Sequence, residues 1–311
     1  MRDILFELLQ LVVIVLVAPL VTGFIKKIKA LLQGRRGPRV LQPYYDLYKY
    51  MRKDAVVSKA SSWIFTATPY VVFGATLAAA ALVPVFMRDS LFSFTGDLVL
   101  LVYLFALARF FIAMAGVDTG SSFGAQGASR EMFVSSLAEP ALFVTLLAAA
   151  LPAGTTHLSS IVAHAAERGW PTSPAFYMMV VAFAILVIAE TGRIPVDNPD
   201  THLELTMIHE GPILEYSGKS LALLQWSASI KQVLLFALLA DLCFPWGLAA
   251  SADGPAVLAG LAVFAVKMAA IGVIVSCVEM STAKMRLFKV PRLLGAALVL
   301  SLFALTAEYL M

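Results

Sequence analysis

Residues 175–210 read AFYMMVVAFAILVIAETGRIPVDNPDTHLELTMIHE, an uncharged apolar run followed at once by a segment rich in titratable groups. The run over residues 175–189 predicts a membrane-spanning helix, although it is shorter than the ~20 residues that a bilayer usually requires. Residues 190–210 then contain five carboxylic acids, two histidines and one arginine. A membrane protein that gathers its charges in one segment is expected to handle protons or to dock a partner there.

The whole chain is too apolar for an ordinary soluble domain, since 60% of its residues are hydrophobic, 14% are charged and the mean hydropathy is +0.86. Long apolar runs recur along it, with no soluble module and no obvious repeat. We therefore predict an all-α, polytopic membrane protein that forms a single integral domain over residues 1–311. About eight transmembrane helices are expected, over residues 4–25, 65–87, 98–117, 132–151, 175–189, 221–244, 256–280 and 293–310.

Positive charges fall mainly on one side of these spans. The links after the first, third, fifth and seventh spans carry most of the Lys and Arg residues, whereas the opposite face has only Arg2, Arg88 and Arg168. Positively charged loops stay in the cytoplasm. Both termini are therefore predicted on the non-cytoplasmic side, and loops 26–64 and 190–220 are predicted in the cytoplasm.

The first cytoplasmic loop contains a turn followed by a short helix. Gly37 and Pro38 favour the turn, and Pro43 can open a helix because its missing N–H costs nothing at the first helical position. From Tyr44 to Met51 aromatic and apolar residues recur at helical spacing, which predicts an amphipathic helix at the membrane interface. A positively charged loop with no further role is the alternative.

The acidic segment is also expected to form a helix. Asn198 is a suitable N-cap with Pro199 after it, and the Gly-Pro pair at residues 211–212 ends the helix. His202 and His209 would then lie two turns apart, about 10 Å, which is too far to share a metal ion. A line of proton-exchanging groups at the membrane edge fits this spacing better, and a solvated cytoplasmic helix is the alternative. The two cysteines lack Cys-x-x-Cys spacing, so we predict no redox centre and no metal in this chain.

Ionisable residues also occur inside the predicted spans, where each is costly and marks a pathway or an ion pair. Glu131 and Glu139 are eight positions apart, about 12 Å along a helix, so they can be separate stations of one path but cannot share a proton. Lys231 and Lys267 are expected at similar depth, where they would repel each other unless one is neutral or an acid such as Glu139 lies between them. Salt bridges that only fix helix register are the alternative.

Two motifs together resemble a known family. Residues 34–38, GRRGP, followed by Gln42, Pro43, Asp46 and Lys49, resemble the first cytoplasmic loop of respiratory complex I membrane subunit 1, the H subunit of bacteria. Residues 190–197, ETGRIPVD, resemble the Glu-Thr-Asn-Arg-x-Pro-Phe-Asp loop of the same subunit. The eight-span layout agrees, so the resemblance covers nearly the whole chain.

Other segments are more similar to the equivalent subunit of membrane-bound, energy-converting nickel–iron hydrogenases, such as formate hydrogenlyase, hydrogenase-4 and the carbon-monoxide-induced hydrogenase. These segments are residues 198–210, residues 211–218 (GPILEYSG), residues 118–124 (DTGSSFG) and residues 127–131 (GASRE). The resemblance implies a non-catalytic membrane anchor that links a cytoplasmic redox arm to antiporter-like membrane subunits in the inner membrane of a prokaryote. It places the nickel–iron site and the iron–sulfur clusters in the hydrogenase large and small subunits, and the departures from the complex I loop argue against a bound quinone.

The resemblance also assigns roles to residues. A path for protons is expected to comprise Glu131, Glu139, Glu190, Asp197, Asp200, Glu204, Glu210 and Glu215, with Arg109, Lys231 and Lys267. A partner-docking surface, or a cavity like that for quinone, is expected to comprise Arg35, Arg36, Gly37, Pro38, Gln42, Asp46, Lys49, Arg193, His202 and His209.

The leading hypothesis is thus an anchor and proton-coupling subunit of a membrane-bound hydrogenase complex. One alternative is the quinone-site subunit of a proton-pumping NADH dehydrogenase. Another is a secondary transporter that uses Arg109, Glu139, Lys231 and Lys267 as its substrate site, although the chain lacks the internal symmetry that transporters commonly show. A passive anchor, in which the acids serve only assembly, is the fourth. The basic residues follow membrane topology, so no nucleic-acid partner is expected.

Overall fold

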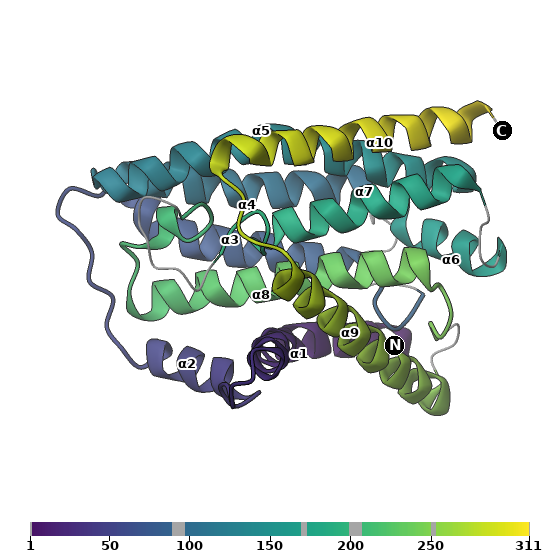
Figure 1. Cartoon of the computed structure of the whole chain (residues 1–311). Helices are drawn as coiled ribbons and strands as arrows, with labels where there is room; N and C mark the ends of the chain where they lie inside the picture. Colours follow the sequence, from purple (N-terminus) through teal and green to yellow (C-terminus); the bar gives the residue numbers. More distant parts are fainter. Residues whose placement is uncertain (1, 89–96, 169–172, 199–206, 250–252, 311) are drawn as a thin grey trace.

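The computed structural model describes residues 2–88, 97–168, 173–198, 207–249 and 253–310, and over these residues it is a bundle of helices without strands (Figure 1). The helices and short 3-10 turns (η) are α1 (Arg2–Leu32), α2 (Gln42–Met51), α3 (Trp63–Leu82), α4 (Leu98–Asp118), α5 (Ser122–Ala150), η1 (Leu151–Ala153), α6 (Leu158–Arg168), α7 (Pro174–Glu190), η2 (Gly211–Ile213), α8 (Gly218–Cys243), α9 (Gly254–Ser281), η3 (Leu287–Lys289) and α10 (Val290–Leu310). The predicted all-α, polytopic fold is confirmed.

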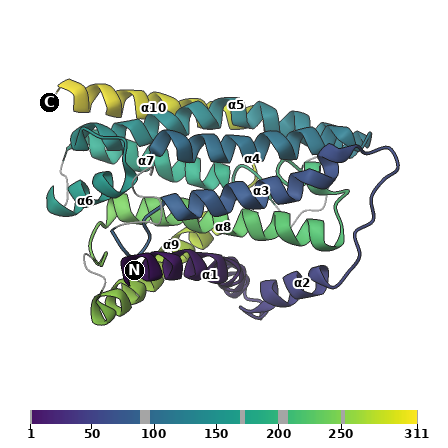
Figure 2. The same cartoon turned by 180° about the vertical axis from the view of Figure 1, so that it is seen from behind.

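Seven helices of the described chain are long and apolar enough to cross a membrane, and α7 is a shorter apolar helix. Its 17 residues give a length of about 26 Å, less than the ~30 Å of a hydrocarbon core. The predicted fifth span is therefore present but short. Both termini lie toward the end of the bundle that holds α6, and α2 lies toward the opposite end (Figures 1 and 2).

The packing order does not follow the chain. Helix α3 lies against α4 and α8, while α10 packs against α5 and α7. Helix α9 contacts α1 and α8 and crosses the bundle obliquely (Figure 1). Bulky side chains from several helices, such as Phe183 and Phe236, are fully buried and fill the core.

Three features differ from the sequence prediction. The predicted span 65–87 ends early, at Leu82, because Pro84 forces the residue before it into an extended conformation. The carboxamide of Gln10 then accepts hydrogen bonds from the backbone N–H groups of residues 85–87 and replaces the lost helical partners. Helix α5 begins ten residues before the predicted start at residue 132, and α6 was not predicted.

The described end of the acidic segment, residues 207–210, does not continue the expected helix. We call residues 191–198 and 207–217 the plug, because its apolar side chains turn into the bundle: Val196 is 0% exposed and Ile208 is 2% exposed. Residues 207–210 are not helical, and η2 packs against α4 and α5. The short α7 leaves room for this fold-back. The predicted helix over residues 199–206, with Asp200, His202 and Glu204, lies outside the described residues.

Candidate functional site

The centre of the candidate site is Arg109, a residue of α4 that is only 5% exposed. Its guanidinium contacts three carboxylates from two other helices. Nη1 lies 2.8 Å from Oε1 of Glu139 and Nε lies 3.4 Å from Oε1 of Glu131, both on α5, while Nη2 bonds Oε2 of Glu190 at the end of α7. A guanidinium suits this position because it stays charged and presents several donors in one plane.

A second cation joins the same acids. Lys231 of α8 places Nζ 2.7 Å from Oε2 of Glu190 and 5.6 Å from the centre of the Phe105 ring. Glu190 therefore bridges Arg109 and Lys231 and ties α4, α7 and α8 together. We call Arg109, Glu131, Glu139, Glu190 and Lys231 the Arg109 cluster. All five were expected in the proton path, and the structure brings them into contact.

The plug extends this cluster through two further ionisable residues. Nε2 of His209 lies 3.7 Å from Oε2 of Glu131, and Nδ1 lies 3.5 Å from Oδ2 of Asp197. Oδ1 of Asp197 in turn accepts from Lys284 at 2.9 Å. Asp197 also accepts hydrogen bonds from the backbone N–H groups of Ile208 and His209, which holds the non-helical plug backbone in place.

These contacts shift the protonation of the plug. Burial raises the pKa of the Asp197 carboxyl, but the hydrogen bonds and charges of His209 and Lys284 outweigh it, so the pKa lies below its usual value. Burial lowers the pKa of His209, yet Glu131 and Asp197 outweigh it and the pKa lies above the usual value. Both shifts favour an ionised Asp197 beside a protonated His209.

Lys267 does not belong to the cluster, contrary to the expectation that it lies level with Lys231. Its Nζ bonds Oδ1 of Asp241 at 2.8 Å. Asp241 lies ten residues beyond Lys231 on α8, about 15 Å along the axis. The tilt of α9 brings Lys267 to that depth, so Glu139 does not separate two lysines.

Arg193 forms another buried polar group. It was expected in a docking surface, but it is 7% exposed and donates to Glu279 of α9 at 3.3 Å and to Gln232 of α8 at 3.0 Å. Lys29 of α1 lies 3.4 Å from the other oxygen of Glu279. The sequence points to Glu279 as a member of a buried polar group, because it is a charge within an apolar span. It contains no comparable indication for Gln232 or Lys284.

The remaining predicted residues lie nearer the surface. Around α2, the exposed members are Arg35, Arg36, Gly37, Pro38 and Lys49, and Gln42 donates to Asp46 at 3.0 Å. Glu215 is exposed after η2, and Glu210 is partly buried. Among the described residues, no ion pair joins the α2 set to the Arg109 cluster.

A cavity of about 140 Å³ adjoins the Arg109 cluster. Arg109, Glu131, Glu190, His209 and Lys231 line its polar side, and apolar residues of α3, α4 and α8 line the rest. The arrangement offers acids, an imidazole and space for small polar molecules in one place.

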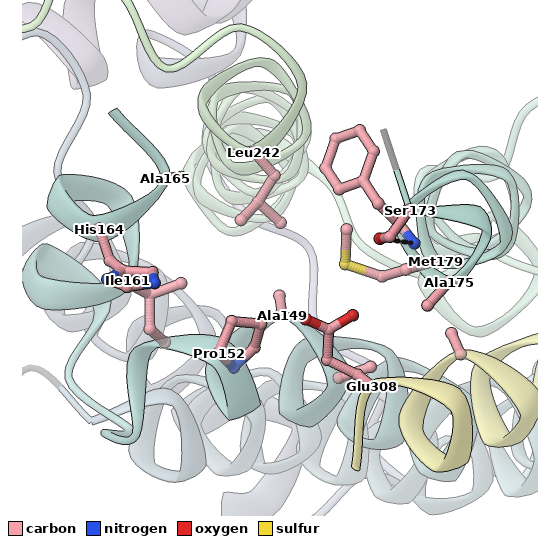
Figure 3. Close-up of a pocket in the computed structure, with 13 residues that line it drawn as sticks. Ala149, Pro152, Ile161, His164, Ala165, Ser173, Ala175, Met179, Leu242 and Glu308 are labelled. Atoms are coloured by element: carbon pink, nitrogen blue, oxygen red, sulfur yellow. Dashed lines mark hydrogen bonds between the residues drawn. The ribbon is translucent and has the colours of Figure 1, made fainter. Parts of the chain in front are cut away.

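A smaller cavity of about 70 Å³ lies at the opposite end, between α5, α6, α7 and α10. Figure 3 shows the Glu308 carboxylate turned toward it beside Ala149, with His164 on another wall. Most of its lining is alanine and other apolar residues. Since it has far fewer ionisable groups, the Arg109 cluster is the better candidate site.

Comparisons with known proteins agree with this layout. A family model described as NADH dehydrogenase matches residues 6–308. Formate hydrogenlyase subunit 4 of Escherichia coli (strain K12) is 37% identical over 296 residues, covering 94% of this chain and 95% of the relative. Hydrogenase-4 component C of the same organism is 36% identical over 283 residues, covering 91% of this chain and 89% of the relative.

A solved structure supports the fold. A chain of the membrane-bound sulfane sulfur reductase, an archaeal respiratory membrane complex, superposes with a TM-score of 0.85 and 21% identity. The match covers 98% of this chain and 99% of that chain. At this identity the likeness concerns the arrangement of helices alone.

Proposed function

The chain belongs to the NADH dehydrogenase family that includes complex I subunit 1, and from this premise we propose that it is the anchor and proton-coupling subunit of a membrane-bound hydrogenase complex. The family resemblance of the two cytoplasmic motifs is thereby confirmed. The chain is a multi-pass prokaryotic membrane protein and a membrane subunit of a complex I-like assembly, so partner subunits are expected.

One observation carries the coupling role: a chain of charged contacts runs from Lys284 through Asp197, His209 and Glu131 to Arg109. Its outer end lies in a cytoplasmic connection and its inner end lies within the spans. Acids that share one guanidinium respond together when any of them changes its protonation. A change of charge or packing at the plug would therefore alter proton uptake deeper in the bundle.

In this proposal the other subunits supply the redox chemistry. The large and small hydrogenase subunits hold the nickel–iron site and the iron–sulfur clusters, and they rest on the plug and the exposed residues around α2. Antiporter-like subunits lie beside the bundle in the inner membrane and receive the signal from the Arg109 cluster. Similarity to formate hydrogenlyase subunit 4 and to hydrogenase-4 component C supports this assignment over a quinone-reducing complex.

The test uses the complete complex in inside-out membrane vesicles, with hydrogen evolution driven by reduced methyl viologen and lumen acidification followed by a pH-sensitive dye. Glu139→Gln should leave assembly and hydrogen evolution intact but lower the number of protons moved per hydrogen. Glu308→Gln is the matched control, because Glu308 is a carboxylate that lines the small cavity at the opposite end of the bundle, outside the Arg109 cluster and the plug. An assembled Glu139→Gln complex with unchanged proton stoichiometry would falsify the coupling role of this acid.

Purification in mild detergent tests the partners separately. A tagged chain should bring down a nickel–iron large subunit and an iron–sulfur subunit. Recovery of a stable, lone chain would reject the complex, whereas tight quinone binding that is lost on Arg36→Ala would favour the NADH dehydrogenase alternative.

A further inference from the structure

His209 is the one residue through which the ion-paired groups of the plug reach those of the Arg109 cluster in the described part of the chain. Its two ring nitrogens face in different directions, one toward Asp197 of the plug and the other toward Glu131 of α5. Without the imidazole, Asp197 keeps Lys284 and Glu131 keeps Arg109, but the two halves are no longer in contact. His209 is therefore placed to connect the plug to the Arg109 cluster or to disconnect the two.

The charge balance of the connected groups depends on this residue. The ion-paired side chains comprise three cations and four carboxylates: Arg109, Lys231 and Lys284 against Glu131, Glu139, Glu190 and Asp197. Within these described contacts one negative charge is left over, and a protonated His209 cancels it. Loss of that proton leaves a net charge in a poorly solvated site, which is costly unless another group takes up a proton.

The backbone is shaped to admit the imidazole. Gly192 has a φ of +61°, and a Cβ built there would lie 3.0 Å from Nδ1 and 3.1 Å from Cγ of His209. A side chain at residue 192 would therefore strain the backbone and push the ring out of its place. Gly192, near the start of the plug, therefore leaves the space that the imidazole of His209 occupies.

The cavity supplies a route for the proton. Oε2 of Glu131, Oε1 of Glu190 and Nδ1 of His209 are buried and have no hydrogen-bond partner within the described residues, and all three residues line the same 140 Å³ cavity. A cavity of this size has room for several water molecules, and the ionisable groups on its polar side offer the two to four polar partners that a buried water needs. Because 3.7 Å between Nε2 and Glu131 is too long for a direct hydrogen bond, transfer between them requires such a bridge.

We propose that His209, seated against Gly192, is the acid–base switch of the coupling path. The imidazolium gives its proton through cavity water to the Glu131 carboxylate, which leaves a neutral imidazole and a carboxylic acid, and the reverse transfer resets the link. This inference rests on the proposed function and names the residue at which the plug controls the Arg109 cluster.

The surroundings of the ring set its resting state. The charged groups that face it are Glu131 of α5, Glu190 of α7, Arg109 of α4, Lys231 of α8 and Asp197 of the plug. The net effect of these neighbours raises the pKa of His209 above its usual value of about 6.5, which favours the imidazolium form.

The test compares three variants of the complete complex in inside-out vesicles. His209→Gln keeps a polar side chain but cannot titrate, Gly192→Ala keeps the imidazole but displaces it, and His164→Gln changes a histidine at the opposite end of the bundle. Viologen-driven hydrogen evolution should be unchanged in all three. Protons moved per hydrogen should fall on the order of tenfold in His209→Gln, should fall less in Gly192→Ala, and should be unaffected in His164→Gln.

The pH profile separates a switch from a structural role. In the wild type, the number of protons moved per hydrogen should decline as pH rises through the pKa of His209. In His209→Gln, the protons that are still moved per hydrogen should not show this decline. Retention of the wild-type profile in His209→Gln overturns the proposal, and so does failure of both plug variants to assemble. If Glu139→Gln uncouples the complex while His209→Gln does not, the coupling function stands and only the role of His209 is rejected.

Discussion

Replacing Gly127 by alanine should loosen the plug from the bundle. Gly127 of α5 meets Gly211 of η2 so closely that an added Cβ would lie 2.6 Å from the Gly211 carbonyl carbon and 2.7 Å from its Cα. Both neighbours are backbone atoms, so relief requires η2 itself to move. Overpacking of this kind usually costs about 1–3 kcal/mol.

The matched control is Gly74→Ala in α3, where a Cβ would meet nothing within 4 Å. Both variants gain the same preference of alanine for a helix, roughly 0.5–1 kcal/mol, so their difference isolates the steric cost. Unfolding of the purified chain in mixed micelles with increasing SDS should give Gly127→Ala a free energy of unfolding about 1–3 kcal/mol below that of Gly74→Ala. Equal stabilities of the two variants would refute the close approach of α5 and η2.

Three further changes test other contacts by the same unfolding assay. Gln10→Leu should destabilise the chain by about 1–3 kcal/mol for each backbone N–H left without an acceptor, and no loss would mean that the carboxamide does not replace the missing helical bonds. Lys267→Met alone should cost about 3–5 kcal/mol because it leaves the buried Asp241 carboxyl without its partner, whereas Lys267→Met with Asp241→Leu should be close to neutral. Strictly additive costs would argue against the pair. The pKa of Asp197 is lower in the folded chain than in the unfolded chain, where it is about 3.9. The ionised Asp197 therefore contributes fully to the free energy of unfolding above pH 3.9, and this contribution is lost as the pH falls from there through the pKa of the folded state. Stability of the wild type should therefore drop more than that of Asp197→Asn between neutral and acid pH, and parallel pH curves would contradict this.

The sequence predicted the features that follow from composition and local pattern. Hydropathy located the spans to within a few residues in most cases, and Pro43 marked the start of α2. The sequence also indicated that Arg109 and Glu139, as charges within predicted spans, would be too costly to leave unpaired. It could not choose their partners, because which faces of α4, α5 and α7 meet depends on packing between helices and not on spacing along one helix.

The predictions that proved wrong also concern features that depend on packing between helices. Counting residues from a helix end gives depth only if the helices run parallel, and the tilt of α9 therefore misplaced Lys267. Residues 207–210 were predicted as the end of a helix at the membrane edge because the N-cap and stop signals are local. The burial of the plug depends on the space beside the short α7, which no local pattern reports. His209 was grouped with docking residues for that reason.

The shortness of α7 has an electrical consequence. Its apolar length of about 26 Å, capped by the ionised groups of the plug, makes the insulating layer at this point thinner than the ~30 Å hydrocarbon core around it. A membrane voltage then falls over a shorter distance and produces a steeper field beneath the plug. A full charge that crosses 100 mV carries about 2.3 kcal/mol, so in the proposed coupling path a proton that enters at this end would cross part of the voltage within this chain, before any neighbouring subunit is reached.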